Sequence, residues 1–354
     1  MSPRLAVALD AMGGDRAPEV AVAGAVLACA EGLGPIDLVG EAEAVQAALA
    51  RHGQSQLPIR VVPATEVIGM AEHPGRAARA KRDSSMHVGY GLVRRHEACA
   101  FVSAGNSGAM MAVGLLELRR VPGCDRPAIA SAMPTAKEPV VLLDLGANVE
   151  CRAPHLVQFA LMGVAFAEAA LGRQRPSVGL LSNGTEPTKG TETLREAHRL
   201  LTGLDLRYVG YVEGRALPQG EVDVLVCDGF VGNVVLKLSE GIARALFDQI
   251  KAELKGDWLG TLGAGLMRKA LNRLQNRLDW VNVGAAPLLG LDGLGLVAHG
   301  ASTPEAIASA IRRAREYAEL DLVARVAASL ANEQAPSERH TTTAELPITR
   351  PEPS

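Results

Sequence analysis

Aromatic side chains are scarce in this chain of 354 residues, where Phe, Tyr and Trp together make up 3%. An excess of one charge is missing as well, because 36 basic residues face 39 acidic ones and the formal net charge is −3. Nucleic-acid binding needs a positive surface for the phosphates, and single strands also need aromatic faces on which their bases stack. The composition therefore argues against a nucleic acid as partner and leaves local basic patches for other anions.

The usual cysteine and histidine patterns are absent too. The five cysteines are odd in number and share no CxxC spacing, which argues against a disulfide framework and against a zinc site. The eight histidines form no HxxxH or HExxH pair, and the chain holds no GxSxG nucleophile elbow. We expect no metal and no cofactor, and a reducing cytoplasm as the compartment.

Long hydrophobic segments are also lacking. The start, MSPRLAVALDAMGGD, has no charged segment followed by an apolar run, so no signal peptide is expected. No stretch approaches the ~20 consecutive apolar residues of a spanning helix. The Pro- and Thr-rich composition from residue 332 predicts a disordered tail over 332–354. With 48% hydrophobic residues, the rest is long enough for a single domain over residues 1–331 with a large core.

The most informative feature of the chain is a unit that recurs six times. In each, a short apolar run rich in Val and Leu ends in a loop of Gly with Asp, Asn or Ser, and a helix-like segment follows. The six runs are residues 5–10, 99–102, 140–143, 178–181, 222–227 and 295–298. Such runs are typical of strands buried on both faces. The pattern predicts an α/β fold whose mostly parallel sheet carries helices on both faces, with the six loops in one polar cleft.

Two of these loops have the composition of a phosphate site. Phosphate binding favours glycines, which let backbone N–H groups approach closely, and the N-terminus of a helix. Residues 103–108, SAGNSG, follow a strand and open a helix, while residues 12–15, MGGD, bring backbone near a ligand. A plain strand-to-helix turn has the same composition. The predicted phosphate ligands are Gly13, Gly14, Gly105, Asn106, Ser107 and Gly108.

Two segments break the pattern of strands and helices. The cations Arg76, Arg79, Lys81 and Arg82 indicate either a solvated face or a site for an anion or an acidic partner protein. Residues 240–281 read as a protruding hairpin of two long helices with basic stems and an apolar tip. This is typical of a membrane-surface element, or alternatively of dimer packing. The tip residues expected to contact a membrane are Trp258, Leu259, Leu262 and Leu266.

Seven motifs make the sequence resemble one family. They are ALDAMGGD, KRDSSM, SAGNSGA, LLDLGAN, SNGTEPTKG, CDGFVGN and APLLGLDG, and they occur in this order between about residues 5 and 320. Together they resemble the bacterial phosphate acyltransferases (acyl carrier protein:phosphate transacylases). Arg16, the run His73–Arg76 and Ala285 depart from that family's pattern. Arg16 stands where a histidine is usual, which puts any role for a histidine there in doubt.

The resemblance implies both an architecture and a reaction. The fold would be related to phosphotransacetylases and to the isocitrate and isopropylmalate dehydrogenases. The reaction would convert a fatty acyl thioester on acyl carrier protein and inorganic phosphate into acyl phosphate. The resemblance further implies a homodimer, peripheral attachment to the inner face of the cell membrane, and delivery of the product to a membrane glycerol 3-phosphate acyltransferase.

A mechanism based on positioning follows from the absence of a catalytic triad. Phosphate would lie on the helix after Gly105 and attack the thioester carbonyl directly, with Lys189 or an arginine of the cluster at 76–82 offsetting its charge. Asn183, Asn233 or backbone donors would meet the developing oxyanion. The predicted catalytic residues are therefore Asn183, Lys189 and Asn233.

Three other functions fit part of the sequence. A short-chain phosphotransacetylase or an NAD-dependent dehydrogenase would use the same fold, and the dehydrogenase would place metal ligands at Asp10, Asp144 or Asp228. NAD binding would identify the dehydrogenase, and use of acetyl-CoA the phosphotransacetylase. A non-catalytic membrane scaffold of lipid synthesis would need the hairpin but not six polar loops.

Overall fold

A computed structural model describes residues 4–53, 57–254, 267, 269 and 285–334 of the chain. Its strands form one eleven-stranded sheet in the order β3-β2-β1-β4-β11-β10-β5-β6-β9-β7-β8. The strands are β1 (Ala6–Asp10), β2 (Ile36–Gly40), β3 (Ile59–Pro63), β4 (Ala98–Ser103), β5 (Ala128–Met133), β6 (Val140–Leu143), β7 (Ser177–Ser182), β8 (Arg207–Glu213), β9 (Val224–Val226), β10 (Ala285–Leu289) and β11 (Gly295–Ala298). All six predicted strands are present.

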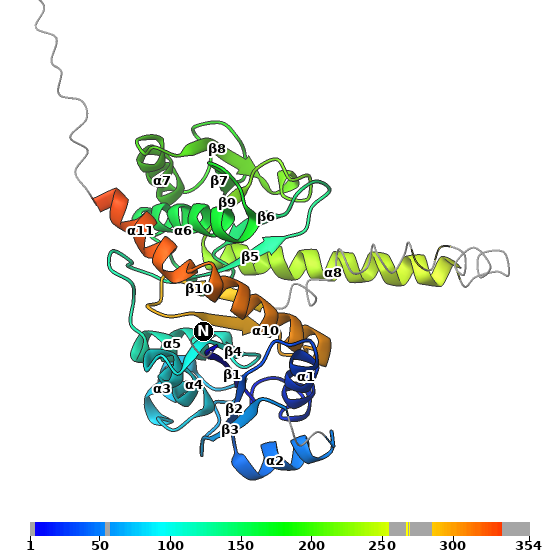
Figure 1. Cartoon of the computed structure of the whole chain (residues 1–354). Helices are drawn as coiled ribbons and strands as arrows, with labels where there is room; N and C mark the ends of the chain where they lie inside the picture. Colours follow the sequence, from blue (N-terminus) through cyan, green and yellow to red (C-terminus); the bar gives the residue numbers. More distant parts are fainter. Residues whose placement is uncertain (1–3, 54–56, 255–266, 268, 270–284, 335–354) are drawn as a thin grey trace, which may run out of the picture.

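Helices cover both faces of this sheet, as the apolar runs predict (Figure 1). Within the described residues they are α1 (Glu19–Ala30), α2 (Ala42–Ala50), α3 (Pro74–Ala80), α4 (Ser85–Arg94), α5 (Ser107–Glu117), α6 (Ala153–Leu171), α7 (Glu192–Thr202), α8 (Gly229–Leu254), α10 (Pro304–Glu319) and α11 (Leu322–Gln334), together with the 3-10 turn η1 (Gly214–Ala216). α1, α6, α10 and α11 pack on one face, and α4 and α5 on the other.

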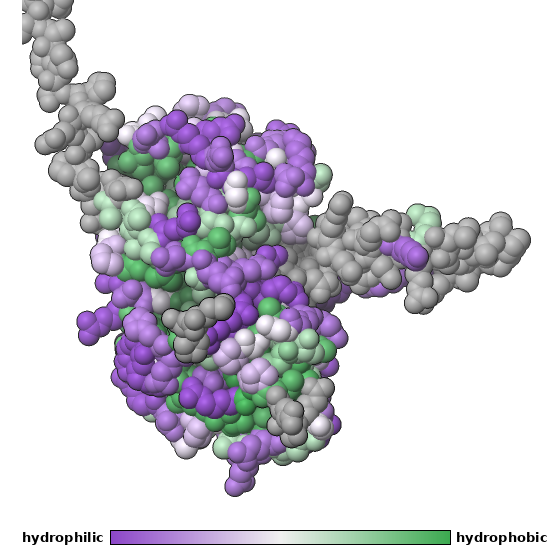
Figure 2. Space-filling model, in the orientation of Figure 1, coloured by the Kyte–Doolittle hydropathy of each residue, from purple (hydrophilic) through white to green (hydrophobic). Residues whose placement is uncertain are grey.

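The alternation of side chains along each strand builds two separate cores. Val7 and Leu9 of β1 join the core under α1 and α10, whereas Ala8 between them joins the core under α4 and α5. Successive side chains of a strand point to opposite faces, so an unbroken apolar run is needed where both faces are covered. Hydrophilic residues cover much of the visible outer surface of the molecule, with hydrophobic patches among them (Figure 2).

The sheet consists of two parallel halves that run in opposite directions. β3, β2, β1, β4 and β11 are parallel, as are β6, β9, β7 and β8, and antiparallel pairs through β10 and β5 join the halves. Although the two halves run in opposite directions, five of the six predicted loops still meet. Residues after β1, β4, β6, β9 and β11 line the cleft described below, whereas the described residues after β7 do not.

Pairing between the two central strands stops early and opens the sheet. β10 pairs with β5 only at Leu288 with Ile129 and at Leu289 with Ala128. The next residue of β10 is Pro287, which has no N–H to donate to a ladder. The strands separate beyond this point, and the space between them becomes part of the cleft described below.

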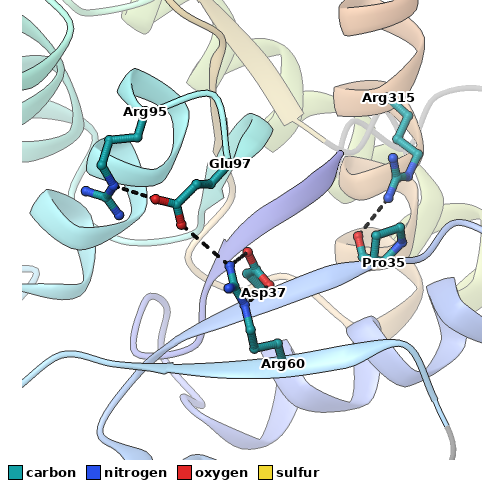
Figure 3. Close-up of polar contacts among 6 residues, drawn as sticks. All are labelled: Pro35, Asp37, Arg60, Arg95, Glu97 and Arg315. Atoms are coloured by element: carbon teal, nitrogen blue, oxygen red, sulfur yellow. Dashed lines mark hydrogen bonds and ion pairs between the residues drawn. The ribbon is translucent and has the colours of Figure 1, made fainter. Parts of the chain in front are cut away.

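Charged side chains connect strands β1, β2 and β3 and helix α10 at two places (Figure 3). The buried Asp37 carboxylate of β2 accepts two hydrogen bonds from Arg60 of β3, at 2.9 and 2.6 Å. Arg315 of α10 is 3% exposed and donates to the carbonyls of Pro35 (2.7 Å) and Leu5 (3.1 Å), which ties the helix to the start of two strands.

One helix, α6, has the length and apolar composition of a membrane-spanning helix, which the sequence reading did not suggest. Two thirds of its most apolar window (67%) is buried inside the structure, where it contacts α7 and α11. This burial is that of a core helix.

The structure describes the first arm of the predicted hairpin and little of the predicted tail. α8 begins at Gly229, eleven residues before the expected start of the hairpin at 240, and runs unbroken to Leu254 away from the body of the molecule (Figure 1). The expected tip, with Trp258, Leu259, Leu262 and Leu266, lies outside the described residues, as does most of the second arm. α11 continues to Gln334, past the domain boundary expected at 331, and residues 335–354 also lie outside the described part.

Candidate functional site

The loops after β1 and β4 are fastened to each other through a buried carboxylate. Asp10 is 2% exposed and accepts hydrogen bonds from the Ser103 hydroxyl (2.6 Å) and the Met12 N–H (3.0 Å). Ser103 Oγ in turn accepts from the Gly105 N–H at 3.0 Å. Burial raises the pKa of Asp10, and these hydrogen bonds oppose the shift. Asp10 therefore organises the two loops.

Two glycines let these loops approach each other. A Cβ on Gly13 would lie 2.8 Å from Asp10 Oδ2 and 2.8 Å from the Gly105 nitrogen, so no side chain fits there. Gly14 has φ +99°, a conformation that favours glycine. The next N–H, from Asp15, donates to the Gly300 carbonyl at 2.9 Å. The loops after β1, β4 and β11 thus form one continuous wall.

The opposite wall starts at Asp144, which follows β6. Its carboxylate is fully buried and accepts from the N–H groups of Ile129 (3.0 Å), Ala147 (3.1 Å) and Asn148 (2.7 Å). Burial is the main cause that raises the pKa of Asp144. Gly232 lies directly against the Asp144 carbonyl, where a side chain would clash, and this contact brings the first turns of α8 to the cleft.

A cleft of about 360 Å³ lies between these walls. Its apolar side is formed by β5, β10, β11 and neighbouring residues: Met70, Ile129, Leu145, Leu236, Ala285, Ala286, Val297 and Ala298. Its polar side carries Asp15, Gly105, Ser107, Ser131, Asn233, Lys237, Glu240, His299, Gly300 and Ala301. Small-molecule sites combine these features, with an apolar lining and a few placed polar groups.

Lys237 is the cation of this cleft, and the sequence reasoning missed it. Its Nζ lies 3.0 Å from Glu240 Oε2 and 3.5 Å from His299 Nε2. Lys237 follows Asn233 by four residues on α8, so both lie on one helical face. The sequence signal that could have identified Lys237 was its position four residues after Asn233, the last residue of the DGFVGN motif. Asp15 and Glu240 are acidic, so attraction for an anion comes from Lys237 and from the N-terminus of α5.

The predicted phosphate ligands occupy different roles. Gly105 and Ser107 line the cleft, and Ser107 is exposed at the first turn of α5. The Asn106 side chain is used otherwise: Oδ1 caps α5 by accepting from the Ala109 N–H, and Nδ2 donates to the carbonyls of Met70 and Glu72. Gly108 lies against α3, where a Cβ would be 2.7 Å from Pro74 Cγ.

Two of the three predicted catalytic residues lie away from the cleft lining. Asn233 lines the cleft, whereas Asn183 and Lys189 belong to the loop between β7 and α7. Asn183 Oδ1 accepts from the Gly190 N–H at 3.0 Å, which closes that loop on itself. Catalytic roles for Asn183 and Lys189 stay predictions.

The basic cluster divides in the same way. Lys81 donates to Glu72 Oε1 and to the Val67 carbonyl at 2.6 Å, so it holds the segment before α3. Arg76, Arg79 and Arg82 are exposed, and their side chains form no hydrogen bond or ion pair within the described ranges. Arg76 and Arg79 lie on α3, which packs beside α5, and Arg82 follows that helix.

The proposed metal ligands do not meet. Asp10 and Asp144 lie in different halves of the sheet, and Asp228 caps the start of α8 by accepting from the Val231 N–H at 2.9 Å. Among the residues that the structure describes, no group of three His, Cys, Asp or Glu side chains is placed to hold a metal ion. Cys227 is buried and its pKa lies well above the ordinary range because of that burial.

Comparisons with known proteins agree with this architecture. A family model described as "Fatty acid synthesis protein" matches residues 5–325. The phosphate acyltransferase of Syntrophotalea carbinolica is 51% identical over 316 residues, which cover 89% of this chain and 91% of that protein. That of Geobacter sp. (strain M21) is 50% identical over 332 residues, 94% of each chain.

Solved structures with little sequence similarity share the fold. A phosphotransacetylase from Streptococcus pyogenes superposes with a TM-score of 0.56 at 17% identity, covering 92% of this chain and 94% of that one. A 4-hydroxythreonine-4-phosphate dehydrogenase from Klebsiella pneumoniae gives 0.54 at 13% identity, with 89% and 100% covered. The expected relation to phosphotransacetylases is confirmed at the level of the fold. From the family model and from relatives at half identity over nearly the whole length, this chain belongs to the phosphate acyltransferase family.

Proposed function

We propose that this acyltransferase transfers a fatty acyl group from the thioester of acyl carrier protein to inorganic phosphate. The observation that carries the proposal is the cleft, which combines a helix N-terminus, one lysine and an apolar side formed by β5, β10 and β11. An anion fits the first two features and an acyl chain fits the third. The expected substrates are therefore an acyl thioester and phosphate, with no cofactor.

The reaction needs these groups for positioning. Phosphate binds at the N-terminus of α5, near Ser107, and Lys237 offsets its charge after leaving Glu240. A phosphate oxygen forms a bond to the thioester carbonyl carbon, the carbon–sulfur bond breaks, and the thiolate leaves and is protonated by solvent. The products are acyl phosphate and the free thiol of the carrier. A thiol of pKa near 8.5 leaves without a strong acid.

Asn233 is the amide best placed to meet the oxyanion. It lines the cleft on the same helical face as Lys237. A single donor to an oxyanion contributes about 3–4 kcal/mol in other acyl-transfer sites. Asn183 and Lys189 would take part only if the loop after β7 reached the bound thioester.

The cations of α3 offer a docking surface for the acidic carrier protein. The side chains of Arg76 and Arg79 on α3, and of Arg82 just after it, have no partner within the described residues, and α3 adjoins α5. Changing Arg76 and Arg79 to Glu should raise the KM for acyl carrier protein substrates and leave that for a small acyl thioester unchanged. Equal effects on both substrates would contradict docking at α3.

α8 supports a homodimer. Its surface carries a stripe of exposed apolar side chains at intervals of four residues: Phe230, Val234, Leu238, Ile242 and Leu246. An apolar stripe of this length on a projecting helix is typical of a helix–helix interface. Leu238→Asp should convert a dimer to a monomer in sedimentation velocity, whereas Lys251→Gln on the same helix should not.

Peripheral attachment to the inner face of the cell membrane, and delivery of acyl phosphate to a membrane glycerol 3-phosphate acyltransferase, complete the proposal. The direction of α8 away from the body supports it, since the predicted tip follows this helix in the chain (Figure 1). Leu259→Glu with Leu262→Glu should abolish co-sedimentation with anionic vesicles. Unchanged pelleting of this variant would refute membrane contact by the tip.

The decisive test of the reaction uses palmitoyl-acyl carrier protein and traps the product with hydroxylamine. Hydroxamate that forms only with both enzyme and phosphate establishes acyl-phosphate formation. Acetyl-CoA in place of the carrier substrate tests the phosphotransacetylase alternative. A folded protein that yields no hydroxamate from either substrate would refute an acyltransferase function.

A further inference from the structure

A second pocket, of about 490 Å³, lies outside the lining of the cleft. It is bounded by the end of α5, the segment before β5 and the start of α6, and its lining is Leu115, Arg120, Asp125, Arg126, Pro127, Arg152 and His155. Three arginines against one aspartate give this lining a net positive charge, with His155 neutral. Neither the proposed reaction nor any motif singled out in the sequence uses these side chains.

The hydrogen bonds of His155 leave two donors facing each other. The imidazole is 4% exposed, and its Nδ1 accepts from the Arg152 backbone N–H at 3.1 Å. A neutral imidazole that accepts at Nδ1 carries its proton on Nε2. That Nε2 lies 3.2 Å from a terminal guanidinium nitrogen of Arg152, which can only donate. The buried Nε2–H therefore has no acceptor in this contact.

An unsatisfied buried donor costs free energy and calls for an acceptor. Burial and the charges of Arg152 and Arg126 also lower the pKa of His155, which keeps the ring neutral. The Asp125 carboxylate makes no ion pair with the three arginines in the described part of the chain, so it does not fill this role. An oxygen between Nε2 and the guanidinium would satisfy both donors.

The other arginines are available to the same ligand. Arg126 is exposed and forms no hydrogen bond or ion pair through its side chain among the described residues. Arg120 uses one nitrogen to donate to the Asp125 carbonyl at 2.6 Å and keeps the rest of its guanidinium. The N-terminus of α6 lies at this pocket, where the His155 side chain accepts from the Arg152 N–H, and the helix dipole adds to the field. Converging guanidinium groups match the several oxygens of a phosphoryl group better than a single carboxylate.

We propose that this pocket is a second anion site, which binds a phosphoryl group between His155, Arg152 and Arg126. The site lies close to the cleft. Pro127, which directly precedes β5, lines the pocket, and Ile129 of β5 lines the cleft, so their Cα atoms are about 7 Å apart in an extended chain. The ligand is either free phosphate or the phosphodiester of the pantetheine arm of a carrier protein, and the site does not depend on the proposed reaction.

Equilibrium dialysis of the full chain with radiolabelled phosphate at low ionic strength tests the site. Arg126→Gln removes a side chain that supports no other contact, and should weaken one of two binding events about ten- to hundredfold. Arg199→Gln, on exposed α7, is the matched control and should change nothing. An Arg126→Gln isotherm that superimposes on the wild type would overturn the proposal.

Lys237→Gln separates this site from the cleft. It should remove the other binding event and leave the one that depends on Arg126. If the proposed reaction site were wrong and the second site right, phosphate binding would depend on Arg126 and not on Lys237. If the reverse held, binding would depend on Lys237 alone.

A local signal and a competition complete the test. The ¹⁵N resonance of His155 Nε2 should shift as phosphate is added to the wild type and stay fixed in Arg126→Gln; a fixed resonance in both would refute binding at His155. If pantetheine 4′-phosphate displaces labelled phosphate with a dissociation constant at least tenfold lower than that of phosphate, the carrier arm is the ligand. Equal affinity identifies free phosphate, and unphosphorylated pantetheine that competes as well would refute phosphoryl recognition.

Discussion

Changing Lys237 to Gln tests the assignment of the cleft most directly. Its Nζ is the cation that the structure places in the cleft. Loss of a hydrogen bond to a charged group costs about 1.5–3 kcal/mol, and each 1.36 kcal/mol corresponds to a factor of ten. The Lys237 side chain is 52% exposed, so solvent screening places the expected effect near the lower limit. We expect the KM for phosphate to rise about tenfold while the KM for the acyl carrier protein substrate stays unchanged.

Two other lysines make this a comparison between hypotheses. Lys189→Gln tests the cation expected from the sequence, and the structure predicts little change in its KM for phosphate. Lys251→Gln is the control on the same helix, about 21 Å farther along α8 at 1.5 Å per residue. Initial rates over a range of phosphate concentrations, measured as hydroxamate, give the three KM values. A raised KM in Lys189→Gln together with an unchanged KM in Lys237→Gln would refute the assignment.

The remaining predictions concern the groups around this lysine. Glu240→Gln frees the ammonium from its 3.0 Å ion pair, so the KM for phosphate should fall; a rise would show that the carboxylate positions the lysine for binding. Gly13→Ala places a Cβ within 3 Å of three atoms of the loops, so it should lower the free energy of unfolding by about 1–3 kcal/mol. Both the melting temperature and kcat should fall. Gly214→Ala is the control, because it has open space around it and should change neither. Because burial raises the pKa of Asp10 above the ordinary 3.8, the folded state binds more protons than the unfolded state between these values, and the contribution of Asp10 to stability falls as pH rises through that window. Asp10→Asn should flatten this part of the stability–pH curve in chemical denaturation, and an unchanged slope would contradict the burial argument.

Strands that form continuous apolar runs were predictable, and strands without such a run were not, including the buried β2 (IDLVG), which Asp37 interrupts. Continuous apolar runs located β1, β4, β6, β7, β9 and β11 to within two residues at each end. β3 and β8 are edge strands whose outer faces are partly exposed, so they alternate and give no continuous run. β10 contains Pro287, which argues against a central strand by local rules. Its position beside β5 depends on pairing between segments far apart in the chain.

This same long-range pairing decides which loops meet. Each loop of the six strand units has the composition of a ligand-binding turn, and the sequence gives no direction for one strand relative to another. Asn183 and Lys189 belong to the loop after β7, which does not contribute to the lining of the cleft, although residues after β6 and β9 of the same half do. Gly105, Ser107 and Asn233 do line the cleft, because each lies between the end of β4 or β9 and the first turns of the helix that follows. Lys237 looked like an ordinary helix-surface lysine, since only the fold brings it to His299.

α8 contributes both to the cleft and to the apolar stripe proposed as the dimer interface. Asn233, Lys237 and Glu240 recur at intervals of four and three residues and face the cleft, while the stripe from Phe230 to Leu246 lies on another side of the same helix. Within the body, α8 is held by its first turns, where Gly232 lies against the Asp144 carbonyl. A partner helix on the stripe would fix the rest of α8 and with it the direction of the Lys237 side chain. Dissociation of the proposed dimer should therefore raise the KM for phosphate at low protein concentration, even though none of the stripe residues lines the cleft.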